Sequence, residues 1–291
     1  MFFLSYISCE DIIQFIDIKS QYLRIDSQVN TAMQRVFDHG QFIMGPEVSS
    51  LESKLCEYTE VEYCVSCSSG TDALLMSLLA IDVKPGDAII TTPFTFIATA
   101  EVIRLVGATP VFVDIEQETF NINPNLIPEA IESAEQKGLV PKAIIPVDLF
   151  GQPADYKEIE SYTHKYDLFT LEDAAQGFGG EINGQKAGSF GNVAATSFFP
   201  AKPLGCYGDG GAILTANEEL AQKMKSIRVH GGGIDKYDNV RLGINGRLDT
   251  LQAAILLEKF SIFTDEVATR NEISHYYTSH LPKYLTSPFL A

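Results

Sequence analysis

Short apolar runs alternate with helix-like segments through the middle of the chain. The segments 96–106, 126–135 and 155–166 carry apolar residues at helical spacing. The runs between them lack the polar alternation of half-exposed strands and are typical of strands buried on both faces. They cover residues 88–92, 110–113, 143–147, 168–172 and 194–199. This alternation predicts an α/β fold with a mostly parallel central sheet and helices on both faces.

The flanking parts of the chain continue this pattern. Short β-prone runs at 63–67 and 210–214 predict two further strands. Apolar residues at helical spacing predict further helices, and Gly40 and Pro46 mark two of their boundaries. These helices cover residues 15–38, 46–58, 71–79 and 218–229, and a long segment from 248 towards the last residue.

The net charge of the chain argues against two classes of binding partner. The 291 residues carry a formal net charge of -17 at pH 7. A nucleic-acid-binding surface and a polybasic membrane anchor both need clustered basic side chains. No apolar run approaches the roughly 20 residues that span a bilayer, and the apolar start lacks the positive charge of a signal peptide. We therefore expect no nucleic-acid partner, no membrane partner and no signal peptide.

The cysteines indicate the redox compartment. They are five in number and widely scattered, which is typical of a reducing cytoplasm rather than of a disulfide framework. Cys64 and Cys67 have C-x-x-C spacing, but a zinc site would need a second pair of ligands, and a redox role is the remaining alternative. We expect a cytoplasmic protein without a metal site.

One lysine stands out after the last of the central apolar runs. Lys202 lies in the stretch 197–205, between prolines that keep the strand from continuing. An amine in a partly desolvated pocket loses its proton more readily and can attack an aldehyde. The alternative is an ordinary solvent-exposed loop lysine.

Two further features favour a reactive Lys202 over an ordinary loop lysine. Asp173 ends another apolar run, and Ser69-Gly70-Thr71 opens a helix whose free N–H groups can hold a phosphate. Because ligands gather at the carboxyl ends of parallel strands, these groups are expected to share a cleft with Lys202. An amine, a carboxylate and an anion cradle are what pyridoxal phosphate (PLP) needs. The alternatives are helix capping by the aspartate and the hydroxyl residues.

Seven motifs together give the chain a family resemblance. The sequence resembles the PLP-dependent aminotransferases of the DegT/DnrJ/StrS type, which aminate keto nucleotide-sugars. This resemblance implies the type I aspartate aminotransferase fold. The motifs run in the family's order from about residue 13 onward. They are FID at 15–17, GPEV at 45–48, SGTDAL at 69–74, PVDLFG at 146–151, EDAAQ at 172–176, SFFPAK at 197–202 and NGRLDTLQAA at 245–254.

The resemblance assigns roles around the cofactor ring. Lys202 would form the Schiff base with PLP and move protons, and Asp173 would pair with the pyridinium nitrogen. Gln176 would contact the ring hydroxyl, and Phe96 would stack on the ring.

It also assigns roles around the phosphate and the substrate. Gly70, Thr71 and Ser197 would hold the phosphate. Asn245 would reach the phosphate of the neighbouring subunit's cofactor, so the resemblance implies a homodimer with shared sites. Arg247 would meet a carboxylate of the sugar, because a guanidinium binds a carboxylate through two hydrogen bonds.

The stretch 199–211 is most similar to the UDP-2-acetamido-2-deoxy-3-oxo-glucuronate aminotransferases. The implied reaction moves an amino group from glutamate to C3 of that sugar, in the synthesis of a bacterial surface polysaccharide such as the O-antigen of lipopolysaccharide. Two alternatives stay open. The chain could act on a 4-keto or neutral sugar, or it could bind PLP and nucleotide-sugar without catalysis.

The family pattern also implies a division of the chain. Residues 13–250 would form the large PLP-binding domain, and residues 251–291 would form a connecting helix and the start of a truncated, incomplete C-terminal small domain.

Overall fold

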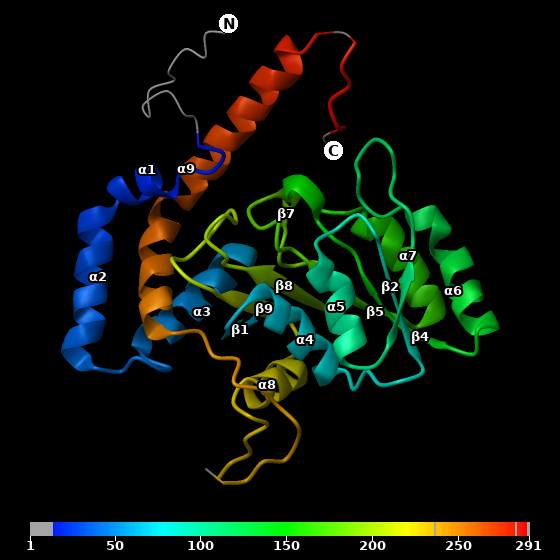
Figure 1. Cartoon of the computed structure of the whole chain (residues 1–291), viewed down its shortest axis with the longest axis horizontal. Coiled ribbons are helices and arrows are strands. Elements are labelled where there is room, and N and C mark those ends of the chain that lie inside the picture. The colour runs from blue at the N-terminus through cyan, green and yellow to red at the C-terminus, as the bar shows by residue number, and fades with distance from the viewer. Residues whose placement is uncertain (1–13, 236, 283, 290–291) are drawn as a thin grey trace, which may run out of the picture.

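A seven-stranded sheet runs through the part of the chain that the computed structural model describes, which is residues 14–235, 237–282 and 284–289. Its strand order is β1-β9-β8-β5-β4-β2-β3 (Figure 1). β9 runs antiparallel to its neighbours β1 and β8, and the other paired strands are parallel. The strands are β1 (Tyr63–Cys67), β2 (Asp87–Thr91), β3 (Thr109–Phe112), β4 (Val140–Ile145), β5 (Phe169–Asp173), β8 (Val193–Ser197) and β9 (Gly211–Thr215). The predicted α/β fold with a mostly parallel sheet is confirmed.

Each apolar run of the sequence overlaps one of these strands, with ends that differ by up to three residues. β1 has the predicted bounds, and β2 and β9 are buried along their whole length because helices cover both faces. β4 differs most from its prediction: it starts at Val140, where it already pairs with Asp87 of β2, and it ends before Pro146. Proline has no N–H to donate to a sheet ladder; β4 holds Pro141 where its register with β2 shifts, and the strand ends before Pro146.

Two layers of helices enclose the sheet. α4, α5 and α8 contact one face, and α3, α6, α7 and α9 lie on the other. α2 packs against α9, outside the sheet layers (Figure 1). The helices are α1 (Ile18–Leu23), α2 (Asp26–His39), α3 (Pro46–Thr59), α4 (Gly70–Ala80), α5 (Ile97–Leu105), α6 (Ile127–Gln136), α7 (Tyr156–Tyr166), α8 (Glu218–Ile227) and α9 (Thr250–His280). Short 3-10 turns η1 (Pro124–Leu126) and η2 (Leu149–Gly151) and a small hairpin, β6 (Glu181–Ile182) and β7 (Gln185–Lys186), complete the fold.

The single helix predicted over 15–38 is wrong. The chain forms α1 and α2 with a break at Arg24 and Ile25, and Ile25 has a non-helical φ of -136°. Its side chain is buried with Val29 of α2 and Ile255 of α9. We attribute the break to this anchor, because a continuous helix would carry Ile25 past its apolar pocket.

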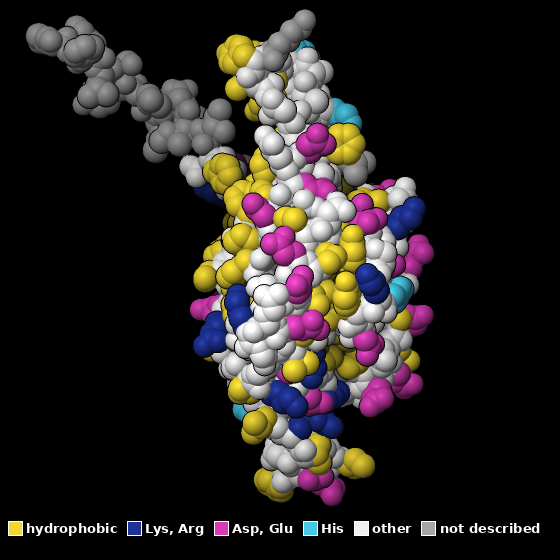
Figure 2. Space-filling model, turned by 90° about the vertical axis from the view of Figure 1, so that its right-hand side faces the viewer, with side chains coloured by type: hydrophobic (Ala, Val, Ile, Leu, Met, Phe, Trp, Pro, Cys, Tyr) yellow, Lys and Arg dark blue, Asp and Glu magenta, His cyan; other side chains and the backbone are white. Residues whose placement is uncertain are grey.

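Two segments project from the body of the molecule. The far end of α9 extends at one end, and the loop that follows α8, described over residues 230–235 and 237–246, extends at the other (Figure 1). Figure 2 shows hydrophobic side chains on both projections. Ile234 and Leu242 of the loop are almost fully exposed. In the described part of the chain, no helix is both long and apolar enough to cross a membrane.

Candidate active site

The candidate residues gather at one edge of the sheet. β1, β5 and β8 point the same way, so Ser68, Asp173 and Ser197 lie at the same end of their strands. Gly211 begins the antiparallel strand β9 at this edge and pairs with both Cys67 and Ser197. Segments far apart in sequence therefore meet where parallel sheets bind ligands.

Lys202 stands on a closed loop that leaves β8. Cys206 N donates to Phe198 O over 2.8 Å, and Lys202 N donates to Phe199 O over 2.8 Å. A Cβ at Gly205 would lie 2.5 Å from Pro200 O, so only glycine allows the loop to fold back this closely. The loop fixes the base of the lysine side chain, which is partly buried.

Asp173 is held by donors on both of its oxygens. Thr99 Oγ1 donates to Oδ2 over 2.8 Å, and Ala175 N donates to Oδ1 over 3.2 Å. Both Asp173 and Thr99 are buried. Thr99 lies on α5, three positions after Phe96. It is a site residue that the sequence did not predict.

Lys202 and Asp173 act on each other through space. Burial lowers the pKa of the Lys202 amine, and the Asp173 carboxylate partly offsets this. Burial raises the pKa of Asp173, and its hydrogen bonds and Lys202 offset part of that effect. Both groups lie at the same edge of the sheet, because β5 and β8 are parallel neighbours.

The start of α4 forms a narrow cradle beside them. Ser69 caps the helix by accepting from Asp72 N over 3.0 Å, which leaves the first N–H groups of the helix, at Gly70 and Thr71, without an intrahelical acceptor. A Cβ at Gly70 would lie 2.6 Å from Ser197 Cβ, and a Cβ at Gly211 would lie 2.5 Å from Ser69 O. Glycine at both positions lets backbone N–H groups and the Ser197 hydroxyl converge on one small volume.

Gln176 and Phe96 border the same edge. Gln176 Oε1 accepts from Phe150 N over 3.4 Å, which ties the turn after β5 to the turn after β4. Phe96 caps α5 with its ring largely exposed. Their contacts with a cofactor stay predictions.

Asn245 and Arg247 lie on the return of the projecting loop. The backbone of Asn245 pairs with Val229, and Gly246 O accepts from Ser68 N over 3.0 Å. This places the segment beside the cradle of its own chain. The Asn245 side chain is exposed and Arg247 is half-buried, and their contacts with a partner or a substrate stay predictions.

These residues fit PLP. The site offers an amine with a lowered pKa, a buried carboxylate kept in place by a hydroxyl, and a cradle that a single Cβ at Gly70 would fill. Those are the groups that a PLP site requires for the aldehyde, the ring nitrogen and the phosphate.

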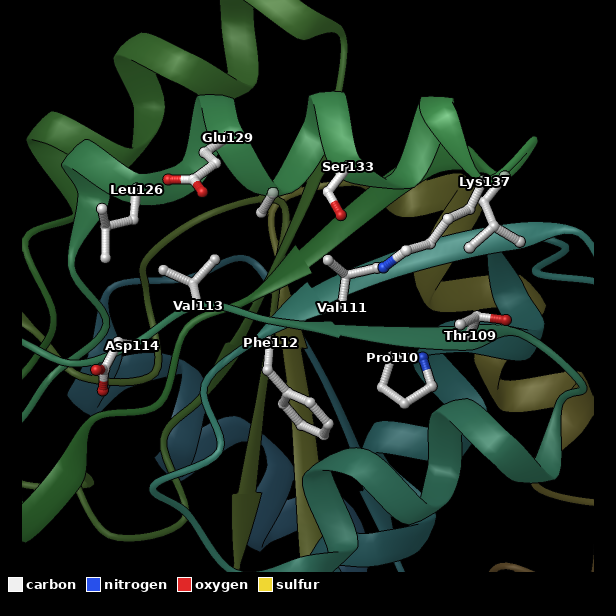
Figure 3. Close-up of a pocket in the computed structure, with 12 residues that line it drawn as sticks. Thr109, Pro110, Val111, Phe112, Val113, Asp114, Leu126, Glu129, Ser133 and Lys137 are labelled. Carbon is white, nitrogen blue, oxygen red and sulfur yellow. The ribbon is translucent and has the colours of Figure 1, made fainter.

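Among the cavities of the described part of the molecule, two lie at different distances from this chemistry. The larger, about 390 Å³, lies between the edge strand β3 and α6 (Figure 3). Its walls include Lys137 and Glu129 but none of the candidate residues. The second, about 330 Å³, is bordered by Lys202 itself, by Asp17 before α1 and by Arg270 of α9. The second cavity is the one that reaches the site.

Comparisons with known proteins agree with this geometry. A sequence profile of the DegT/DnrJ/EryC1/StrS aminotransferase family matches residues 23–287. The chain is 47% identical over 279 residues to a UDP-2-acetamido-2-deoxy-3-oxo-D-glucuronate aminotransferase of Pseudomonas aeruginosa, covering 96% of this chain and 76% of the relative. It is 39% identical over 269 residues to a UDP-N-acetyl-3-dehydro-alpha-D-glucosamine 3-aminotransferase of Acidithiobacillus ferrooxidans, covering 92% of this chain and 71% of that relative.

A solved structure is also similar. The crystal structure of a DegT DnrJ EryC1 StrS aminotransferase from Brucella abortus superposes with a TM-score of 0.94 at 49% identity. The match covers 96% of this chain and 75% of that structure. The chain thus spans about three-quarters of the length of these proteins.

Proposed function

Because the chain belongs to the DegT/DnrJ/EryC1/StrS aminotransferase family, we propose that it aminates C3 of a UDP-linked 2-acetamido-3-oxo sugar acid. Members of this family are PLP-dependent transaminases that act on nucleotide-sugars, and this chain is one of them. The observation that supports the proposal is that the buried Asp173, at the end of β5, and Lys202, on the loop after the neighbouring strand β8, lie at one edge of the sheet.

Each residue of the site has a defined task in that reaction. PLP, when bound, supplies a ring that withdraws electrons from the reacting carbon. Asp173 holds a proton on the ring nitrogen, and Thr99 keeps the carboxylate oriented for it. Lys202 Nζ takes and returns the proton at the substrate carbon, a role that its lowered pKa favours. Gly70, Thr71 and Ser197 bind the phosphate through N–H and hydroxyl groups.

The choice of sugar rests on one side chain and one relative. The Pseudomonas aeruginosa relative is named for an oxo-glucuronate, which carries a carboxylate. We assign Arg247 to that carboxylate, because its guanidinium can donate two parallel hydrogen bonds. The Acidithiobacillus ferrooxidans relative is named for a dehydro-glucosamine, which keeps a neutral 3-keto sugar as the alternative. A 4-keto sugar is the second alternative within the family.

The cavity beside Lys202 is our candidate path for the amino donor, which we propose to be glutamate. Arg24, Arg270 and Lys202 on its walls carry positive charge, and Asp17 and Glu266 carry negative charge. A donor with two carboxylates and one ammonium group matches such a mixed lining.

We further propose that the enzyme works as a homodimer in the cytoplasm, in surface polysaccharide synthesis such as that of O-antigen lipopolysaccharide. The loop 230–246 exposes Ile234, Val240 and Leu242 far beyond what an isolated surface loop requires. Asn245, at the base of this loop, would then contact the phosphate of the partner's cofactor. Residues 13–250 would form the large domain, and residues 251–291 the connecting helix and the start of a small one.

The test compares two lysines in the 291-residue chain. Purified protein is reconstituted with PLP, and the visible absorbance of bound PLP and the amination of a UDP-3-keto sugar acid are measured. Lys202→Ala is expected to lose the absorbance band and turnover, whereas Lys54→Ala, a surface lysine paired with Glu57, keeps both. Wild-type protein that binds no PLP would overturn the proposal. Bound PLP without amino transfer to any keto nucleotide-sugar would favour the non-catalytic alternative.

A further inference from the structure

Arg228 and Glu52 form an ion pair at one edge of the sheet, and the reaction above does not use it. Glu52 lies on α3, and Arg228 is the residue that caps the end of α8. Arg228 Nη1 lies 2.6 Å from Glu52 Oε1, with 6% and 16% of the respective side chains exposed. Taking two charges out of water is costly unless other groups complete their hydrogen bonds, so the surroundings of the pair indicate its role.

Ser66 of β1 completes the hydrogen bonding of the pair. Glu52 Oε1 accepts from Ser66 N over 2.9 Å and from Ser66 Oγ over 2.7 Å, and Arg228 Nη1 donates to Ser66 O over 2.9 Å. β1 is the last strand of the described sheet on this side, so its outer N–H and C=O groups have no strand to pair with. The carboxylate and the guanidinium take the place of that strand and fix the edge of β1.

The backbone of Arg228 holds the end of the projecting loop. Arg228 O accepts from Gly246 N over 3.0 Å, and Gly246 O accepts from Ser68 N over 3.0 Å. Ser68 directly precedes the phosphate cradle at the start of α4, and the neighbours of Gly246 are Asn245 and Arg247. Arg228 therefore contacts β1 with its side chain and the segment 245–247 with its backbone, and that segment in turn contacts the residue that leads from β1 into the cradle.

We propose that the Arg228–Glu52 pair positions two parts of the active site relative to each other, the phosphate cradle and the segment 245–247. This rests on the proposed function, which gives the cradle its phosphate and gives Asn245 and Arg247 their ligands. Groups that bind a ligand must be held within about 0.5 Å of their productive positions. Without the ion pair, Ser66 N and O lose their partners, and the two backbone hydrogen bonds of Gly246 alone remain of this network.

Substitutions of Arg228 separate its charge from its size. Arg228→Met keeps an unbranched stem and removes the charge and the donors, which leaves a largely buried carboxylate without its cation. Arg228→Lys is the conservative variant, because Nη1 makes every side-chain contact named above and a lysine amine can replace that one nitrogen. Arg228 Nε, by contrast, has no acceptor among the described residues. Arg35→Met is the matched control, since it breaks an ion pair with Glu258 in which the arginine side chain is 56% exposed.

The first measurement needs no cofactor. Amide hydrogen exchange is followed by mass spectrometry in the cofactor-free 291-residue chain, in peptides that cover residues 66–71 and 244–247. Arg228→Met is expected to raise the exchange rate of both peptides at least about tenfold, because their shared anchor is lost. Arg228→Lys is expected to restore part of the protection, and Arg35→Met to match wild type. Wild-type exchange in Arg228→Met would overturn the proposal, whether or not the chain has aminotransferase activity.

Glu52→Gln keeps the proposal testable if Arg228→Met fails to fold. Its amide oxygen still accepts from Ser66 N, but the negative charge that faces the guanidinium is gone. We expect faster exchange in the same two peptides, by a smaller factor than in Arg228→Met. Exchange that stays at the wild-type rate in both would then overturn the proposal.

The second measurement separates positioning from a general loss of structure. The dissociation constants of PLP and of pyridoxal, which lacks the phosphate, are compared. Arg228→Met is expected to raise that of PLP roughly 10–100-fold and that of pyridoxal less than about threefold, because only PLP uses the cradle. Equal increases would show that the pair supports the fold without positioning the cradle. PLP binding that depends on Arg228 in a chain that aminates no keto sugar would overturn the proposed function and leave the positioning role in place.

Discussion

Glu172 and Asp173 are consecutive residues of β5. Their carboxyl groups lie on opposite faces of the strand and have different roles. Successive side chains of a strand point to opposite faces of the sheet. Asp173 meets Thr99 of α5 and the charge of Lys202. Glu172 meets the backbone of the segment 188–190 and the carboxyl group of Asp148.

Asp173 and Glu172 differ in the groups that contact their carboxyl oxygens. Asp173 keeps a buried negative charge beside a cation and can hold a proton for a ligand. The carboxyl oxygens of Glu172 contact only groups of the protein, namely two backbone N–H groups and a neighbouring acid. A buried carboxylate with fixed protein partners stabilises structure, whereas one that faces a cavity and an amine is available for chemistry.

The largest expected effect separates the two faces most sharply. Asp173→Asn removes the charge that would hold the proton on the cofactor ring, and we expect turnover to fall on the order of 10²–10³-fold. Burial raises the pKa of Asp173, so its folded pKa exceeds the unfolded one and its charge costs stability as pH rises. The cofactor-free Asp173→Asn protein should therefore be at least as stable as wild type at pH 8. Steady-state kinetics and thermal melting measure the two effects.

In Glu172→Gln the amide N–H₂ would face the backbone N–H of Gly188 or Phe190, and we expect this loss of about 1–3 kcal/mol to exceed the gain from removing a buried group with a raised pKa. Equal losses of stability in both variants would mean that the two faces of β5 do not differ as described.

The next effect concerns the hydroxyl that orients Asp173. Thr99→Val keeps the shape of the side chain but removes the donor to Oδ2. Because a hydrogen bond to a charged group contributes about 1.5–3 kcal/mol, kcat/KM is expected to fall roughly 10–100-fold. Thr99→Ser restores the hydroxyl and serves as the control. If Thr99→Val and Thr99→Ser have the same activity, the Asp173 carboxylate is oriented by other contacts.

The sequence predicted the surroundings of Asp173 more fully than those of Glu172. The apolar runs predicted where β5 and β8 end, and residues at the ends of parallel strands meet at one edge, so Asp173 and Lys202 could be brought together. Thr99 could not be found in this way, because its contact with Asp173 spans 74 residues and depends on how α5 lies on the sheet.

The contact between Glu172 and Asp148 could not be predicted from the sequence for a related reason. Glu172 stands inside an apolar run, which indicates burial, but its partner depends on β4 lying beside β5 in the sheet order. The sequence pattern predicts strands without ordering them. The break at Ile25 has the same origin, since the anchor is Ile255, far along the chain on α9.

The smallest expected effect concerns Tyr156, which contacts Asp148 on the Glu172 side of β5. Tyr156→Phe removes the hydroxyl that donates to Asp148 Oδ1, while Ala154 N still donates there. The ring keeps its stacking on Phe190, with centroids 4.4 Å apart, so packing is retained. We expect a loss of about 1 kcal/mol in the free energy of unfolding.

The direction of the accompanying pH shift distinguishes this from ordinary hydroxyl loss. Burial raises the pKa of Asp148 to about 7, above the unfolded value of about 4, so its contribution to stability is expected to be lost as pH rises through about 7. The hydrogen bond from Tyr156 lowers that pKa, so Tyr156→Phe is expected to raise it and to move this midpoint to higher pH. Tyr162→Phe on the same helix removes a hydroxyl away from Asp148 and is expected to leave that midpoint unchanged. Melting curves at pH 6, 7 and 8 measure the shift. A midpoint that moves to lower pH in Tyr156→Phe would show that the Tyr156 hydroxyl does not lower the pKa of Asp148.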